Sequence, residues 1–140
     1  MRWLPLAAVC AGFLALADFF VKLASDKISS SLGMLVYGTA TFLAATIWVL
    51  YERAAGRAFY ITLPGFWYAA GVGLAFSGVT ILLYLTFARV NVSVGSPVIR
   101  ITGILLASLL GILILREAVT WRYVLGLALA VAGVALIVFR

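Results

Sequence analysis

The chain has 140 residues, of which 66% are hydrophobic and 10% charged, and its formal net charge is +6. No soluble globular domain has this composition, and the apolar residues extend over the whole length. One Cys and no His exclude a disulfide framework and leave no ligand set for a metal cluster. The positive charges lie at the ends of the apolar segments rather than in a cluster. This pattern indicates contact with anionic lipid headgroups and not with nucleic acid.

Five apolar segments are each long enough to cross a bilayer, which takes roughly 20 residues. They predict helices at about residues 3–24, 32–51, 63–88, 95–115 and 121–139. Pro64 and Pro97 fit the first turn of the third and fourth helices, where the missing amide hydrogen costs no hydrogen bond. The predicted fold class is all-α, a polytopic membrane protein with five transmembrane helices. Residues 1–140 are expected to form one domain without a soluble module.

The distribution of Lys and Arg hardly distinguishes the two ends of the predicted bundle. The N-terminal side collects Arg2, Arg53, Arg57, Arg116 and Arg122, and the opposite side collects Lys22, Lys27, Arg89 and Arg140, with Arg100 close to it. Because a difference in positive charge orients membrane proteins, this balance predicts insertion in both directions. A fixed orientation is the alternative. The Trp residues favour it, since all four lie near the N-terminal side: Trp3, Trp48, Trp67 and Trp121.

Among the charged residues, Asp18 of the first apolar segment and Arg100 of the fourth stand out, because each is surrounded by apolar residues rather than placed at the segment end. Such residues are costly in hydrocarbon, and they mark a polar pathway or the membrane interface. We expect Asp18 and Arg100 to approach each other across a polar cavity, since both lie toward the same side of the bilayer. The alternative roles of Arg100 are binding of a substrate carboxylate or phosphate and anchoring of the helix at the headgroups.

Asp18 precedes Lys22 by four residues, which places both side chains on one helix face. One interpretation is an ion pair at the helix end, with Lys22 reaching the interface. The other is that Asp18 faces a central cavity and binds a proton or cation in competition with substrate. Among the uncharged polar residues, Tyr37 and Tyr84 are the better candidates for substrate contacts, because aromatic faces hold amphipathic or cationic compounds.

Glycines in the predicted helices indicate close packing, since helices in a bilayer associate through small residues rather than through the hydrophobic effect. Gly126 and Gly133 lie seven residues apart on one face of the last helix. A seam with a second chain and packing within the protomer both fit this spacing. For Gly71, Gly73 and Gly78 of the third helix we expect packing within the protomer.

The stretch from Gly71 to Arg140 resembles the EamA domain of the drug/metabolite transporter superfamily. The resemblance rests on Tyr84-Leu85-Thr86-Phe87-Ala88, on Arg116-Glu117-Ala118-Val119-Thr120 and on the closing Gly126…Gly133 helix. Most members carry two such units, and the units are inverted because each has an odd number of spans. The resemblance therefore implies half of an inverted-repeat transporter, which needs a second copy to form a carrier. An antiparallel homodimer agrees with the balanced charge.

The predicted function is secondary transport of a small metabolite or amphipathic compound across a prokaryotic cytoplasmic membrane, with proton coupling as one option. The expected partners are the lipid bilayer, the substrate and a second copy of the chain. The alternatives are a flippase for a lipid or lipid-linked phosphate and a non-transporting subunit of a larger membrane complex. The sequence has no phosphate-binding loop, nucleophile constellation or catalytic carboxylate pair. We therefore expect neither an enzyme nor a cofactor.

Overall fold

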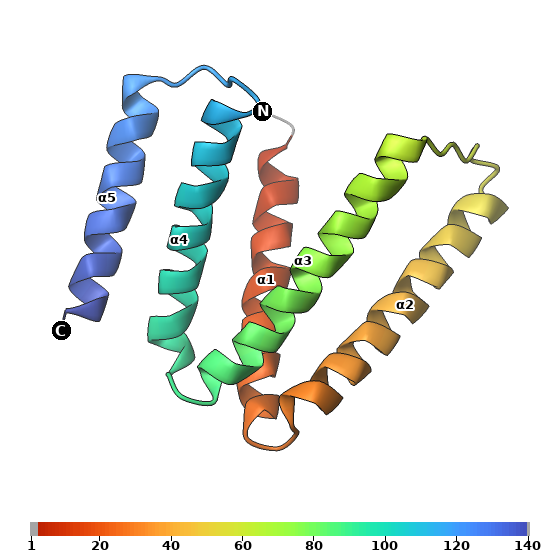
Figure 1. Ribbon diagram of the computed structural model, residues 1–140, viewed down its shortest axis with the longest axis horizontal. Helices are drawn as coiled ribbons and strands as arrows, with labels where there is room; N and C mark the ends of the chain where they lie inside the picture. Colours follow the sequence, from red (N-terminus) through yellow and green to blue (C-terminus); the bar gives the residue numbers. More distant parts are fainter. Residues whose placement is uncertain (1–2, 140) are drawn as a thin grey trace. The chain divides into compact units, whose positions relative to one another are not determined.

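The structure, a computed structural model, describes residues 3–139. Within them the chain forms five α-helices and no strand (Figure 1). The helices are α1 (Leu4–Ser25), α2 (Ser30–Ala54), α3 (Leu63–Phe87), α4 (Val92–Leu113) and α5 (Trp121–Val138). All five are long and apolar enough to cross a membrane, so the fold is that of a multi-pass membrane protein. The predicted fold class is confirmed. Arg2 and Arg140, which entered the charge comparison above, lie outside the described residues.

Most large apolar side chains lie on the surface of the chain. Among the described residues, the buried hydrophobic side chains are Leu83 and Phe87, and both belong to α3. In water, exposed apolar area of this extent would drive aggregation. In a bilayer the hydrocarbon covers it at no cost, because lipid tails are as apolar as the side chains.

The helix beginnings show where local sequence decides the fold. Pro64 lies in the first turn of α3, as predicted, and the Thr62 hydroxyl accepts a hydrogen bond of 3.2 Å from the Gly65 amide. The prediction for Pro97 is wrong, because α4 starts at Val92 and Pro97 lies inside the helix.

The earlier start of α4 has a local cause in Asn91. This residue is extended, with φ −68° and ψ 142°, and its carbonyl accepts a hydrogen bond of 2.9 Å from the Gly95 amide. The helix thus begins before the apolar run does. Pro97 then removes the amide that would donate to the carbonyl of Ser93, four residues earlier.

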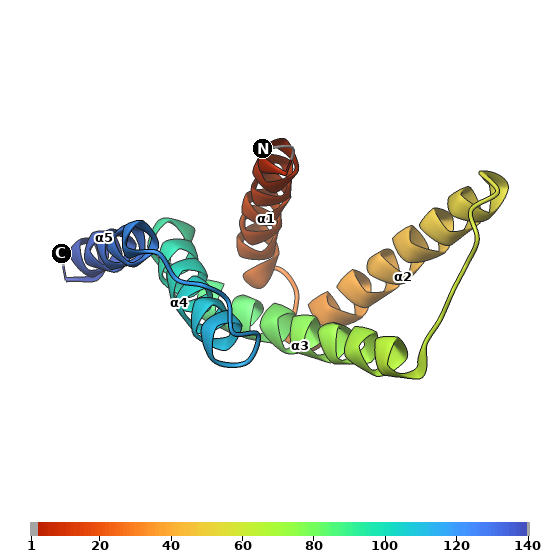
Figure 2. The same ribbon diagram turned by 90° about the horizontal axis from the view of Figure 1, so that it is seen from above.

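The helices form two compact units, one up to Arg89 and one from Val90 onward. In the first unit, α3 packs against both α1 and α2. Its three helices converge where α1 and α3 end and α2 begins, and they diverge toward their other ends (Figure 2). The second unit is an antiparallel hairpin in which α4 and α5 lie side by side.

Among the glycines of the first unit, Gly33, which is buried in α2, is the one that lies against a neighbouring helix. A Cβ atom built on Gly33 would lie 2.6 Å from Cζ of Tyr84 in α3. A Cβ built on Gly71, Gly73 or Gly78 would meet no atom within 4 Å. Within the first unit these three glycines therefore make no close contact of the kind seen at Gly33, and their packing elsewhere in the protomer stays a prediction.

The second unit is held together near the loop that joins α4 to α5. The Tyr123 hydroxyl of α5 donates a hydrogen bond to the Ser108 hydroxyl of α4. The Glu117 amide donates to the Gly111 carbonyl at 3.2 Å, and a Cβ on Gly111 would lie 2.8 Å from the Glu117 carboxylate. Arg116 has a φ of 55°, in the left-handed region, and turns the chain back at this point. Glu117 thus packs onto the last turn of α4.

Candidate functional site

The candidate site of the first unit is the end at which its helices converge. Asp18, Thr80 and Phe87 are buried there. Asp18 lies seven residues before Ser25, the last residue of α1, and Thr80 lies seven residues before Phe87, the last residue of α3. Seven residues correspond to about 10 Å of helix. The two polar side chains therefore occupy equivalent positions, well inside helices that can span the membrane.

Asp18 is the most unusual residue of this site, because its relative exposure is 1%. Burial of a carboxylate is costly unless hydrogen bonds or an opposite charge compensate it. Among residues 3–139, every buried side-chain nitrogen or oxygen has a hydrogen-bond partner, so the burial of Asp18 is compensated. An ionisable residue in such a position marks a functional site in membrane proteins.

Lys22 lies one turn beyond Asp18, at the edge of the site. Its Nζ atom donates a hydrogen bond of 2.5 Å to the carbonyl of Phe87 and lies 4.0 Å from Oδ2 of Asp26. The last carbonyls of a helix lack intrahelical donors, and a positive charge beside them is favourable. Lys22 therefore lies at the helix end and fastens α1 to the end of α3. The interpretation of Asp18 and Lys22 as an ion pair stays a prediction.

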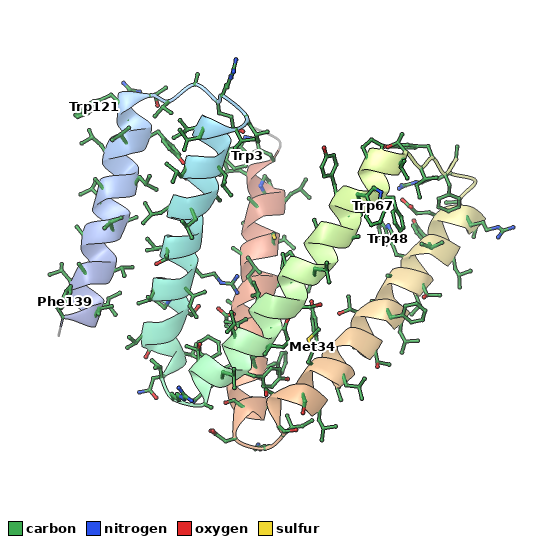
Figure 3. All side chains as sticks on the ribbon, in the orientation of Figure 1. Trp3, Met34, Trp48, Trp67, Trp121 and Phe139 are labelled. Carbon is green, nitrogen blue, oxygen red and sulfur yellow. The ribbon has the colours of Figure 1, made fainter. Side chains whose placement is uncertain are left out.

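A groove of about 540 Å³ lies between α2 and α3 in the same unit. It is lined by Met34, Tyr37, Gly38, Thr41, Phe42 and Ala45 of α2 and by Val72, Gly73, Phe76 and Ser77 of α3. Figure 3 shows Met34 near the converging ends of these helices. Tyr37, a predicted substrate contact, is 36% exposed and lines the groove. Tyr84, the other predicted aromatic contact, instead places its ring against Gly33.

The second unit contains the other predicted site residues. Arg100 is half-buried in α4. Its proposed approach to Asp18, which belongs to the first unit, stays a prediction. Gly126 and Gly133 are exposed in α5, and a Cβ on either would meet no atom within 4 Å. Neither glycine therefore makes a close contact within the second unit, and both a seam with a second chain and packing within the protomer stay predictions.

Sequence reasoning missed Thr80 and Phe87 as parts of the site, and it did not distinguish Gly33 from the other glycines of the helices. In the sequence, Thr80 is one of several hydroxyl residues in the predicted helices. Its hydroxyl donates a hydrogen bond of 2.9 Å to the Phe76 carbonyl, which is the usual partner of such a residue within a helix. Phe87 is one apolar residue among many. No spacing within α2 or α3 distinguishes Gly33 from glycines that face open space, so the sequence carries no signal for these contacts.

No family model, no curated protein and no solved structure matches this chain.

Proposed function

We propose that the chain is one EamA-type unit and acts as a secondary transporter for a small metabolite or amphipathic compound in a prokaryotic cytoplasmic membrane. The observation that supports this most is Asp18, a carboxylate with 1% exposure inside a helix long enough to span the bilayer. Buried acidic residues in such helices serve as proton or ion sites in pumps and transporters. The proposed mechanism is therefore transport of the substrate coupled to binding and release of a proton at Asp18.

A second copy of the chain completes the proposed carrier. Carriers with inverted repeats place the substrate near the bilayer midplane, between two units of opposite orientation. This chain supplies five helices that can span the membrane, which is one unit of such a carrier. An antiparallel homodimer would provide both units. In each copy, Lys22 keeps the end of α1 fixed to α3, which holds the segment that carries Asp18 in place.

A comparison of two carboxylates tests the proposal. Bacterial cells that express the chain are exposed to a panel of toxic amphipathic compounds, and accumulation of each compound is measured. We expect lower accumulation of at least one compound, loss of this effect in Asp18→Asn, and retention in Asp26→Asn, which removes an exposed carboxylate two turns further along. The proposal fails if no compound accumulates less, or if Asp18→Asn transports as well as the parent chain.

A further inference from the structure

The groove between α2 and α3 has the size and lining of a small-molecule site. Its volume of about 540 Å³ falls within the usual range for ligand pockets, about 300–1,000 Å³. Aromatic and thioether side chains from Phe42, Phe76 and Met34 provide apolar walls. Such walls suit flat or aliphatic groups, since sulfur and ring faces contact aromatic ligands favourably.

Three hydroxyl residues give the groove a polar component: Tyr37, Thr41 and Ser77. The Ser77 hydroxyl donates its hydrogen to the Gly73 carbonyl at 2.8 Å, so its oxygen keeps only acceptor capacity toward a ligand. A lipid acyl chain has no group that hydrogen-bonds to such an oxygen. An occupant that carries a hydroxyl or amide N–H can do so, and in hydrocarbon this bond has no competition from water.

None of the ten lining residues is charged. A charged ligand would therefore lose its hydration without gaining an opposite charge in the groove, which is strongly unfavourable. The groove lies between two helices that can span the membrane, so a ligand reaches it from the hydrocarbon. The uncharged lining and the access from the hydrocarbon both favour an uncharged, lipid-soluble ligand.

We propose that the α2–α3 groove binds an uncharged amphipathic compound with an aromatic or aliphatic body and at least one hydrogen-bond donor. The proposal deepens the proposed function, on which its role in transport rests, by naming the class of substrate. Binding itself requires neither Asp18 nor a proton gradient. The two proposals can therefore fail separately.

Two neighbouring glycines provide a matched pair of variants. Gly73 lines the groove and Gly71 does not, and a Cβ on either residue meets no atom within 4 Å. Gly73→Leu should fill the groove without a clash at its Cβ. Gly71→Leu makes the same change in helix propensity and apolar volume, two residues away in α3. Thr41→Val is a milder variant that removes one hydroxyl and keeps the side-chain shape.

The probe is a photoactivatable benzyl alcohol with a trifluoromethyl diazirine on its ring, added to the purified chain in lipid nanodiscs. Peptide mass spectrometry then locates and quantifies the labelled residues. We expect saturable labelling of groove residues, a loss of about tenfold or more in Gly73→Leu, which corresponds to at least ~1.4 kcal/mol, and a smaller loss in Thr41→Val. Gly71→Leu should be labelled like the parent chain.

Three results would overturn the proposal. The first is labelling that rises linearly with probe concentration, since this indicates partitioning into lipid. The second is equal labelling of the Gly71→Leu and Gly73→Leu variants. The third concerns a phosphatidylcholine that carries the same diazirine on its acyl chain: it labels the groove saturably, and the benzyl alcohol does not compete with this labelling. That result would assign the groove to lipid.

Discussion

Asp18 and Lys22 are one helical turn apart, yet they have different environments. The Asp18 carboxylate is buried, whereas the Lys22 ammonium lies at the helix end, against the Phe87 carbonyl. One turn of helix thus separates a buried acidic side chain from a basic side chain at a helix terminus. In the proposed transporter, this division assigns proton or ion exchange to Asp18, whereas Lys22 holds two helices together.

At the residue scale, Gly33 gives a sharp prediction about stability. Gly33→Ala should lower the free energy of unfolding by about 1–3 kcal/mol, because the new methyl group overlaps the rigid ring of Tyr84. The matched change Gly38→Ala in the same helix meets no atom within 4 Å and should be neutral or stabilising by up to about 1 kcal/mol. Unfolding in mixed micelles of increasing denaturing detergent measures both values.

A second substitution tests the cause of this effect. Tyr84→Leu removes the ring that overlaps the new methyl group, so the cost of Gly33→Ala should be smaller in that background. Equal costs in both backgrounds would show that the Gly33–Tyr84 approach does not determine stability.

At the scale of helices, length and hydropathy predicted the elements well. Each helix was placed to within a few residues, because spanning helices need long apolar runs and their ends need polar or capping residues. The start of α4 was missed because Asn91 begins the helix before its apolar run. Helix rotation was not predictable: α3 is apolar all round, so its sequence does not show which face contacts α1 or α2. The groove and the buried end of the first unit depend on that rotation.

The exposed glycines of α5 lead to a prediction about assembly. Within Trp121–Val138 no residue is buried, and Gly126 and Gly133 face open space. If they form a seam with a second chain, Gly126→Leu and Gly133→Leu should each lower the dimer fraction, because a leucine prevents close backbone approach. Ala128→Leu, on another face of α5, is the control. Chemical crosslinking in nanodiscs measures the dimer fraction, and an unchanged fraction in both glycine variants would exclude this seam.

At the scale of the whole molecule, the balanced charge predicts insertion in both orientations. In a Cys10→Ser background, Ala58→Cys places one thiol in the exposed loop between α2 and α3. A membrane-impermeant maleimide should label about half of the chains in intact cells, and the rest only after permeabilisation. Adding Phe59→Lys and Tyr60→Lys should shift labelling toward one state, since extra positive charge retains this loop in the cytoplasm. Uniform labelling of the starting chain would establish a fixed orientation.

The divergence of α1, α2 and α3 from one common end makes the first unit wedge-shaped (Figure 2). If the common end lies toward one membrane surface, a unit of this shape occupies more area in one leaflet than in the other. Two wedges of the same orientation would add their areas in one leaflet and bend the bilayer around them. Two first units of opposite orientation would displace equal numbers of lipids from both leaflets, so the proposed antiparallel pair would cancel the curvature stress that this unit alone produces.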